Sequence, residues 1–262
     1  MTNFEPSPYI HQKIKDHILE LEIDRRDKKN ALTDRMYQTL SRALSDAQVN
    51  PDIRVIFLHG QADLFTSGND LKDFMEIDLR QGSAAVDFLH LIASYPKPLI
   101  AAVGGPAIGI GTTLLLHCDM ALASEEAIFQ MPFINLGVCP EGGSSFLLQQ
   151  SAGQKLSNEL LLLGEVFTSQ VAKQAGLINH IYNASEIIAQ GWELCKKMAS
   201  KPQDSMRTTK ALIKAHQSGQ IQGVIDNEFE QFARLLQTPA AKEIMTAILE
   251  KRSPNTTLSQ SS

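Results

Sequence analysis

The chain of 262 residues is long enough for one large domain, or for one domain with a helical appendage, and for a sizeable core. Its net charge of −5 and the lack of a basic face argue against nucleic acid as the main partner. No apolar run is long enough to span a membrane, and the polar start lacks the apolar core of a signal peptide. The three cysteines have neither zinc-binding nor disulfide-framework spacing, which indicates a reducing compartment, and we expect the cytoplasm.

The first third of the sequence predicts strands alternating with helices. Residues 18–23 alternate apolar and acidic side chains, which is typical of a half-buried antiparallel strand. Thr33 is placed to cap an amphipathic helix that ends before Pro51. Residues 54–59 have the apolar, β-branched composition of an inner strand, and residues 86–95 show the pattern of a second amphipathic helix.

The stretch from 97 to 143 is the centre of the sequence. An apolar strand over 99–103 runs into a glycine-rich turn over 104–111, and an uncharged helix over 112–118 follows. A helix without a charged face has to be buried on all sides. Two further strands are predicted over 119–123 and 127–131, and this order of strands and helices predicts right-handed crossovers along one core.

The sequence beyond Gly143 is mostly helical in pattern. Thr168 and Thr238 stand where N-caps would lie. The helices are expected over 144–150, 156–163, 169–175, 186–200, 205–215, 221–236 and 240–251.

Two glycine-bearing turns are the first candidate for chemistry. Each of the turns, Ser67-Gly68-Asn69-Asp70-Leu71 and Gly109-Ile110-Gly111, leaves a strand and enters a helix. Either one alone is best explained as a turn with a helix cap. Together they predict two sets of backbone N–H donors that converge on one small volume, where the helix dipole favours a developing negative charge.

Glu141 is the candidate general base. A glutamate between proline and glycine is commonly a surface residue, but apolar neighbours precede this one, and burial would raise the pKa of its carboxyl toward a useful range. Glu125 and Glu126 lie in a polar turn and are expected to be solvated. His117 is expected to be a satisfied core residue, and Asp119 a buried structural carboxylate. The seven histidines show no metal-binding spacing, so no metal is expected.

The sequence resembles the crotonase (enoyl-CoA hydratase/isomerase) superfamily at these same residues. The matching segments are DRRDKKNAL (24–32), LFTSGNDL (64–71), PLIAAVGGPAIGIG (98–111), CDMALASEEAIF (118–129) and LGVCPEGGSS (136–145). The resemblance implies an α/β fold, a crotonase-like spiral of ββα units with a C-terminal helical oligomerisation region, assembled as a homotrimer or hexamer. The expected division is a core over 1–200 with the active site, a helical region over 201–252 and a disordered tail over 253–262.

The resemblance also assigns roles to the site residues. The substrate would be an acyl-CoA thioester, with CoA as part of the substrate and no separate cofactor. The backbone N–H groups of Asn69 and Ile110 would bind the thioester oxygen, and Glu141 would be the base. The other substrate-binding residues would be Lys28, Lys29, Ala31, Leu32, Ser67, Gly68, Asp70, Leu71 and Gly109. The basic cluster from Arg25 to Lys29 is either a solvated turn or a site for the phosphates of CoA.

The member of the superfamily is indicated by the acids that this sequence lacks. Hydratases of the family use two glutamates, and the matching positions hold Thr113 and Phe133. The single glutamate in the Pro-Glu-Gly segment is similar to that of the peroxisomal-type Δ3,Δ2-enoyl-CoA isomerases of fatty acid metabolism. We therefore expect isomerisation of 3-enoyl-CoA to trans-2-enoyl-CoA. The alternatives are hydration or thioester hydrolysis through the same enolate, and a non-catalytic acyl-CoA-binding relative.

Overall fold

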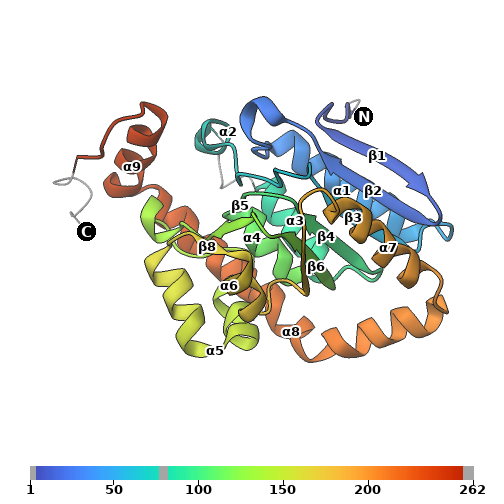
Figure 1. The fold of residues 1–262 in the computed structure, drawn as a ribbon. Coiled ribbons are helices and arrows are strands. Elements are labelled where there is room, and N and C mark those ends of the chain that lie inside the picture. Colours follow the sequence, from blue (N-terminus) through green and yellow to red (C-terminus); the bar gives the residue numbers. More distant parts are fainter. Residues whose placement is uncertain (1–3, 77–81, 256–262) are drawn as a thin grey trace.

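The computed structural model describes residues 4–76 and 82–255. Its main sheet has six strands in the order β1-β2-β3-β4-β6-β9, and only the β1–β2 pair is antiparallel (Figure 1). These strands are β1 (Ile10–Lys15), β2 (Ile18–Ile23), β3 (Val55–His59), β4 (Leu99–Val103), β6 (Met120–Ser124) and β9 (His180–Tyr182).

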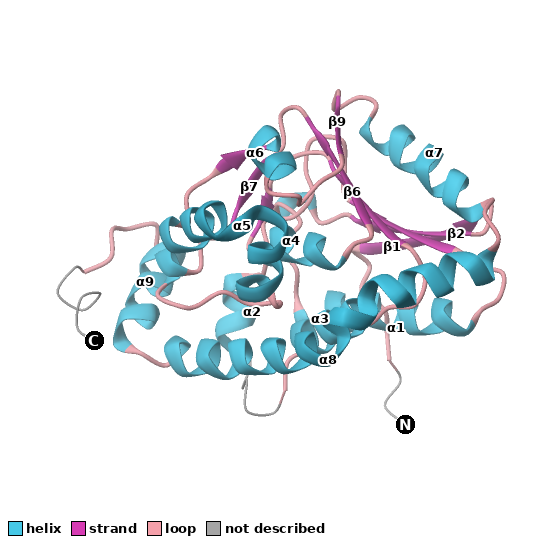
Figure 2. Ribbon diagram, turned by 90° about the horizontal axis from the view of Figure 1, so that it is seen from below, coloured by secondary structure: helices cyan, strands magenta, loops and turns pink. Residues whose placement is uncertain are grey.

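Helices cover both faces of this sheet (Figure 2). The helices α1 (Asp34–Val49) and α3 (Ala84–Ala93) pack on one face through the larger hydrophobic core, and α7 (Ile187–Ala199) packs on the other. Because β3 and β4 are covered on both faces, every residue of these two strands is buried, as their continuous apolar sequences predict. Thr33 caps α1 by accepting the Met36 N–H, as expected.

A second, smaller sheet extends from the end of β4 and carries the glycine-rich segment. It consists of β5 (Ala107–Ile108), β7 (Ile128–Gln130) and β8 (Phe167–Thr168). The uncharged helix expected over 112–118 is instead a short α4 (Ile110–Thr113) followed by a 3-10 helix, η3 (Leu114–His117). The burial of this segment is as predicted, with only Leu116 of these residues partly exposed. The other short elements are η1 (Arg26–Lys28), α2 (Leu71–Glu76) and η4 (Ile134–Leu136).

The C-terminal part is helical, as expected, but two pairs of the expected helices are each joined into one longer helix. The sequence predicts separate helices over 205–215 and 221–236, whereas the structure has one helix, α8 (Gln203–Leu236). Gly219 lies inside it, because one glycine destabilises a helix by only about 1 kcal/mol relative to alanine and does not end it. The two helices expected over 144–150 and 156–163 form α5 (Ser144–Leu163), with a kink at Gly153. The remaining helices are α6 (Ser169–Gln174) and α9 (Pro239–Leu249).

The mixed α/β class is confirmed, and the predicted N-caps Thr168 and Thr238 both accept a backbone N–H at the start of their helices. Within residues 4–76 and 82–255, no helix combines the length and apolar character that crossing a bilayer requires. Four strands were not predicted, namely β1, β5, β8 and β9. Three of them have only two or three residues, too few for a periodic pattern, and β1 exposes five of its six side chains.

Candidate active site

The two glycine-bearing turns lie side by side, because β3 and β4 are parallel neighbours and end at the same edge of the sheet. Thr66 donates its N–H to the Pro106 carbonyl at 2.9 Å, and Ile108 donates its N–H to the Thr66 carbonyl at 3.0 Å. Gly68 has a φ of +88°, and a Cβ at this position would lie 2.6 Å from the Ile108 carbonyl oxygen. Only glycine therefore allows the two turns to approach this closely.

The backbone N–H groups of Asn69 and Ile110 are free donors in these turns. On one side of each, the adjacent N–H group is occupied: the Asp70 N–H bonds to the Leu32 carbonyl, and the Gly109 N–H bonds to the Gln130 carbonyl. Within the described part of the chain, neither the Asn69 N–H nor the Ile110 N–H has an acceptor. Ile110 also opens α4, where N–H groups have no partner within the helix. Both predicted oxyanion donors are thus available to a ligand.

Glu141 lies at the wall of a pocket with about 400 Å³ of empty space. The carboxyl is partly buried and accepts a hydrogen bond from the Thr113 hydroxyl. Asn69 also lines the pocket, and the other lining residues are Ser83, Ala85, Val86, Leu89, Gly142, Ile225, Phe229 and Phe232. One predicted donor residue and the predicted base therefore face the same pocket, whose walls are mainly apolar.

The environment of Glu141 gives its carboxyl the properties of a base near neutral pH. Burial raises its pKa to about 8, the hydrogen bond from Thr113 opposes this rise, and the charge of Glu228 adds to it. A carboxyl with this pKa both accepts and returns a proton readily near pH 8. The expectation that apolar surroundings raise the pKa of Glu141 is confirmed in direction.

Tyr37 and Thr113 are polar neighbours of the site to which the sequence analysis gave no role. The Tyr37 hydroxyl donates to the Asn69 side-chain oxygen at 2.5 Å, and burial followed by the nearby Glu141 charge raises the pKa of Tyr37. Thr113 occupies a position where the resemblance places a hydratase glutamate, and it contacts Glu141 directly. Phe133, at the other such position, is buried with its ring 6.5 Å from that of Phe232. Neither Thr113 nor Phe133 supplies a second acid.

The segment expected to bind CoA runs beside the first turn. Leu32 donates its N–H to the Gly68 carbonyl, and Asp70 donates to the Leu32 carbonyl, each at 2.8 Å. Ala31 accepts a hydrogen bond from Arg25, and that guanidinium also pairs with Asp70 at 2.8 Å. Ser67 donates its N–H to the Lys29 carbonyl at 3.0 Å, and Leu71 begins α2 just after the turn.

The basic cluster divides into paired and exposed residues. Arg25 pairs with Asp70, and Arg26 pairs with Asp63 at 2.5 Å, so these two cations stabilise loops. Lys28 and Lys29 are exposed, and their ammonium groups form no ion pair within residues 4–76 and 82–255. These two lysines are the part of the cluster that is open to an anionic group.

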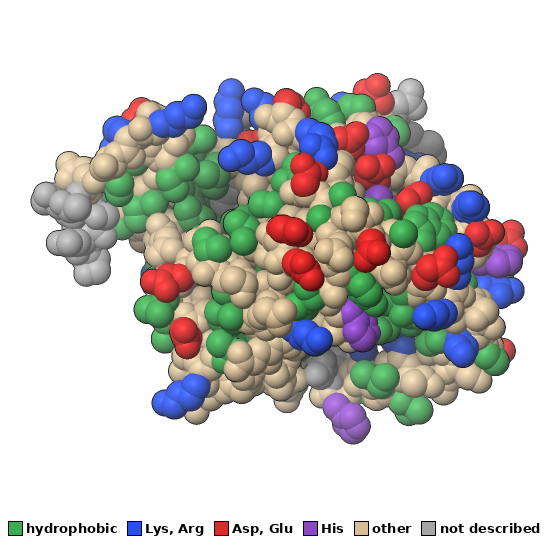
Figure 3. Space-filling model, in the orientation of Figure 1, with side chains coloured by type: hydrophobic (Ala, Val, Ile, Leu, Met, Phe, Trp, Pro, Cys, Tyr) green, Lys and Arg blue, Asp and Glu red, His purple; other side chains and the backbone are tan. Residues whose placement is uncertain are grey.

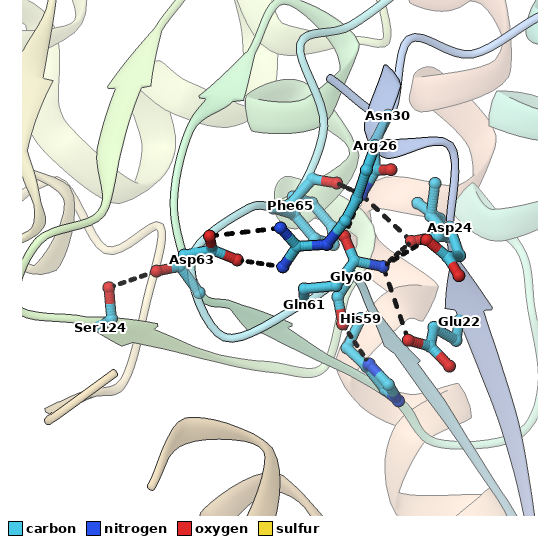
Figure 4. Close-up of polar contacts among 12 residues, drawn as sticks. Glu22, Asp24, Arg26, Asn30, His59, Gly60, Gln61, Asp63, Phe65 and Ser124 are labelled. Atoms are coloured by element: carbon cyan, nitrogen blue, oxygen red, sulfur yellow. Dashed lines mark hydrogen bonds and ion pairs between the residues drawn. The ribbon is translucent and has the colours of Figure 1, made fainter. Parts of the chain in front are cut away.

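A network of buried amides supports the loop between β3 and the first turn (Figure 4). The Asn30 side chain is fully buried and donates to the Phe65 carbonyl at 2.9 Å and the Ile23 carbonyl at 3.1 Å. Gln61 donates to the Ile23 carbonyl at 2.8 Å, and the Arg26–Asp63 pair closes the far side of the loop. No local pattern in the sequence reveals this network, since its partners are up to 38 positions apart.

The expectations for His117, Glu125 and Glu126 are met, while Asp119 has the expected structural role but is only partly buried. His117 is buried and donates from Nε2 to the Gly142 carbonyl at 2.7 Å, while burial lowers its pKa to about 4. Asp119 accepts the Leu99 N–H at 2.7 Å and an ion pair from Lys210 at 2.5 Å. Glu125 and Glu126 are exposed. Each of these residues has the structural role that the sequence predicts.

Comparisons with known proteins point to one family. A model of the enoyl-CoA hydratase/isomerase family matches residues 13–257. The chain is 34% identical over 242 residues to enoyl-CoA delta isomerase 2 of Rattus norvegicus. This match covers 89% of this chain and 62% of the rat protein, so the chain spans less than two thirds of the length of that relative. It is 32% identical over 240 residues to 2,3-dehydroadipyl-CoA hydratase of Escherichia coli (strain K12), covering 91% and 94%.

Solved structures agree with this result. The crystal structure of an enoyl-CoA hydratase/isomerase from Pseudoalteromonas atlantica T6c has a TM-score of 0.89 at 34% identity, covering 94% of this chain and 99% of that one. The crotonase-like fold that the sequence indicates is therefore confirmed. Together with the converging turns and the buried carboxyl, these matches show that the chain belongs to the enoyl-CoA hydratase/isomerase family of the crotonase superfamily.

Proposed function

We propose that this protein shifts the double bond of a 3-enoyl-CoA to give trans-2-enoyl-CoA, with Glu141 as the single acid and base. The observation that carries the proposal is one partly buried carboxyl with a pKa of about 8, facing a mainly apolar pocket beside the Asn69 turn. An acyl chain fits the apolar walls, and the exposed Lys28 and Lys29 suit the phosphates of CoA.

The proposed reaction moves one proton and needs no further cofactor. The thioester oxygen accepts hydrogen bonds from the N–H groups of Asn69 and Ile110, each worth roughly 2.7–4 kcal/mol in the transition state. The Glu141 carboxylate removes a proton from the α-carbon, and the electron pair of the C–H bond forms a dienolate with its charge on the thioester oxygen. The carboxylic acid then returns the proton to the γ-carbon, which leaves the conjugated alkene.

Hydration is the second candidate, because a hydratase of Escherichia coli is as similar to this chain as the isomerases are. Adding water needs a second group that activates it, and Thr113 and Phe133 stand at the positions that the resemblance assigns to hydratase glutamates. Glu228 is a further buried carboxyl near Glu141, but its two oxygens already accept three hydrogen bonds. These observations favour isomerisation over hydration.

A homotrimer or hexamer is proposed as the assembly. Apolar side chains gather on the side of the molecule below α9 (Figure 3). Leu162, Leu163 and Val166 are each more than half exposed. Ile134, which is 50% exposed, lies beside them, because a Cβ built on Gly164 would be 3.1 Å from its side chain. Exposed apolar surface of this kind suits a contact between copies of the chain.

Location in the cytoplasm stays a prediction of the sequence.

Glu141→Gln tests the proposed reaction. The amide cannot take the α-proton, so turnover of 3-hexenoyl-CoA to 2-hexenoyl-CoA is expected to fall by roughly 10²–10⁴-fold. The product is followed by the ultraviolet absorbance of the conjugated thioester, and binding of hexanoyl-CoA by calorimetry is expected to persist. Glu125→Gln, at an exposed position, is the matched control and should retain full activity.

The same assay separates the two candidate reactions. A hydratase consumes 2-hexenoyl-CoA and forms the 3-hydroxyacyl thioester, whereas an isomerase accumulates 2-hexenoyl-CoA. Full activity of Glu141→Gln would reassign the base, and hydration of 2-hexenoyl-CoA without isomerisation would replace the proposed function by the second candidate.

A further inference from the structure

We propose that Glu228, on α8, is the positioning residue of the catalytic base: its carboxylate fixes the turn over 142–145 and stands as a negative charge behind Glu141. This role depends on the proposed function, because that function makes Glu141 the base. The contacts between Glu228 and the turn do not depend on it. Glu228 does not line the pocket, so it acts on the substrate only through Glu141.

The carboxylate of Glu228 is 6% exposed and is fully used by the turn that follows the base. Its Oε2 accepts the Gly143 N–H at 2.6 Å. Its Oε1 accepts the Ser145 N–H at 2.9 Å and the Ser145 hydroxyl at 2.5 Å. These contacts join two segments that are more than 80 positions apart in the sequence.

The turn needs an external acceptor because its own cap has no side chain. Gly143 is the N-cap of α5, so no N-cap side chain can accept the first N–H groups of the helix. A carboxylate supplies that acceptor and is favoured by the helix dipole. Glu228 therefore does for α5 what a serine or aspartate cap does in most helices.

The same turn is held from its other side through carbonyl groups. The Glu141 carbonyl accepts the Ser144 hydroxyl at 2.6 Å, and the Gly142 carbonyl accepts His117 Nε2 at 2.7 Å. Gly142 and Gly143 both have positive φ values near +70°, a conformation that these contacts hold in place. Without Glu228 the N–H groups of Gly143 and Ser145 lose their acceptor. The backbone that follows Glu141 is then held less firmly, although the Glu141 carboxyl keeps its hydrogen bond from Thr113.

The charge of Glu228 acts on the base as well. Among the groups around Glu141, His117 from η3 has a lowered pKa, while Tyr37 from α1 and Cys139 from the same loop have raised ones, all chiefly through burial. These three groups are uncharged near pH 7, and α3 contributes the apolar Ala85, Val86 and Leu89 to the pocket. Burial raises the pKa of Glu228 itself, and its three hydrogen bonds oppose that rise.

Glu228→Gln tests this role, with Glu230→Gln as the matched control because Glu230 is an exposed residue of the same helix. The amide keeps the size of the side chain but loses the charge and one acceptor. We expect kcat for 3-hexenoyl-CoA to fall about tenfold with KM changed less than about threefold, since a small displacement of the base affects the chemical step. Glu230→Gln should match the wild type.

A second measurement follows Glu141 without relying on the reaction. The titration of its carboxyl is read by ¹³C NMR of protein labelled at glutamate carboxyls, with the signal assigned by its absence in Glu141→Gln. Loss of the like charge in Glu228→Gln is expected to move the titration of Glu141 to lower pH. Ser145→Ala removes the hydroxyl donor to Glu228 and keeps the two backbone N–H contacts. It should lower kcat less than Glu228→Gln does. This variant still tests the role if Glu228→Gln folds poorly.

The outcomes separate this role from the proposed function. If the wild type isomerises and Glu228→Gln matches it in kcat or in the titration of Glu141, the positioning role is overturned and the function stands. If the wild type does not isomerise but the titration of Glu141 moves in Glu228→Gln, the function fails and the positioning role stands. If neither isomerisation nor a shift is observed, both are overturned.

Discussion

At the scale of single residues, the chemistry depends on how one carboxyl is surrounded. Burial and the Glu228 charge raise the pKa of Glu141, while the Thr113 hydroxyl lowers it by bonding to the charged form. Thr113 therefore affects the pKa of Glu141, although its hydroxyl cannot serve as a second acid or base. It keeps the base from binding its proton too tightly at neutral pH.

Thr113→Val is predicted to move the pH profile of the enzyme. Valine keeps the shape and removes the donor, so the pKa of Glu141 rises above about 8 and less of the carboxylate form exists at pH 7. The rising limb of kcat/KM is expected to shift to higher pH, as measured with 3-hexenoyl-CoA from pH 5.5 to 10. Thr113→Ser, which retains a hydroxyl, should keep the limb near its original place. An unchanged limb in the valine variant would contradict the role given to Thr113.

At the scale of elements, buried cations join the helices to the sheet. The Lys97 ammonium donates to the carbonyls of Ala47 at 2.5 Å and Asn50 at 2.6 Å at the end of α1, and to that of Ile53 at 2.7 Å in the loop before β3. The last carbonyls of a helix lack partners within it, and a cation there also interacts well with the helix dipole. Lys97 thus fixes α1 just before β4 begins.

Lys97→Met is predicted to destabilise the protein without changing its chemistry. Loss of the cation removes the donor that the buried carbonyls of Ala47 and Ile53 share, which lowers the free energy of unfolding by about 1–3 kcal/mol. Urea unfolding at pH 7 measures this change, and kcat per folded molecule is expected to stay within twofold. Lys155→Met, at an exposed position, serves as the control and should leave stability nearly unchanged.

At the scale of the whole molecule, the active site lowers the stability of the fold. Glu141 has a pKa of about 8 when folded, against about 4.3 for glutamate in an unfolded chain. Between these pH values the folded state therefore binds more protons than the unfolded state. The contribution of Glu141 to the free energy of unfolding falls over this range and is lost as the pH rises through 8. A carboxyl with a pKa near 8, which suits the proposed base, thus lowers the stability of the folded state at alkaline pH.

Glu141→Gln is predicted to gain stability relative to the wild type as the pH rises. The amide has no charge to bury, so the difference in free energy of unfolding between the two proteins should increase from pH 5 to pH 9. Urea unfolding at pH 5, 7 and 9 measures it, with Glu125→Gln giving a difference that is flat with pH. A constant difference for Glu141→Gln would show that the carboxyl is not perturbed by folding.

The sequence predicts what local patterns determine. The strand over 99–103, the cap at Thr33 and the burial of the segment after the glycine-rich turn all follow from composition and spacing within a few residues. The two turns could be paired because parallel neighbouring strands end at one edge. The raised pKa of Glu141 was predicted from the apolar residues that precede it in the sequence, but the apolar walls of its pocket come from α3 and α8.

What the sequence did not predict depends on contacts between distant segments. Tyr37 reaches Asn69 across 32 positions, and Glu228 reaches Gly143 across 85. Nothing in the pattern around Glu228 distinguishes it from Glu230, although one is buried and the other exposed. Glu228 differs from Glu230 only in lying one helical turn before Phe232, on the side of α8 that faces the core. The sequence does not show which side of α8 faces the core.

Because α8 carries both a wall of the pocket and the carboxyl of Glu228 near Glu141, the shape of the pocket and the proton affinity of Glu141 are physically linked in this protein. Ile225, Phe229 and Phe232 line the pocket in which the proposed function places the acyl chain, and Glu228 lies among them on the same helix. Any substitution that slides or rotates this helix to admit a longer or bulkier fatty acyl group also changes the electrostatic surroundings of Glu141. Relatives that diverge in chain-length preference through this helix are therefore expected to diverge in pH optimum at the same time.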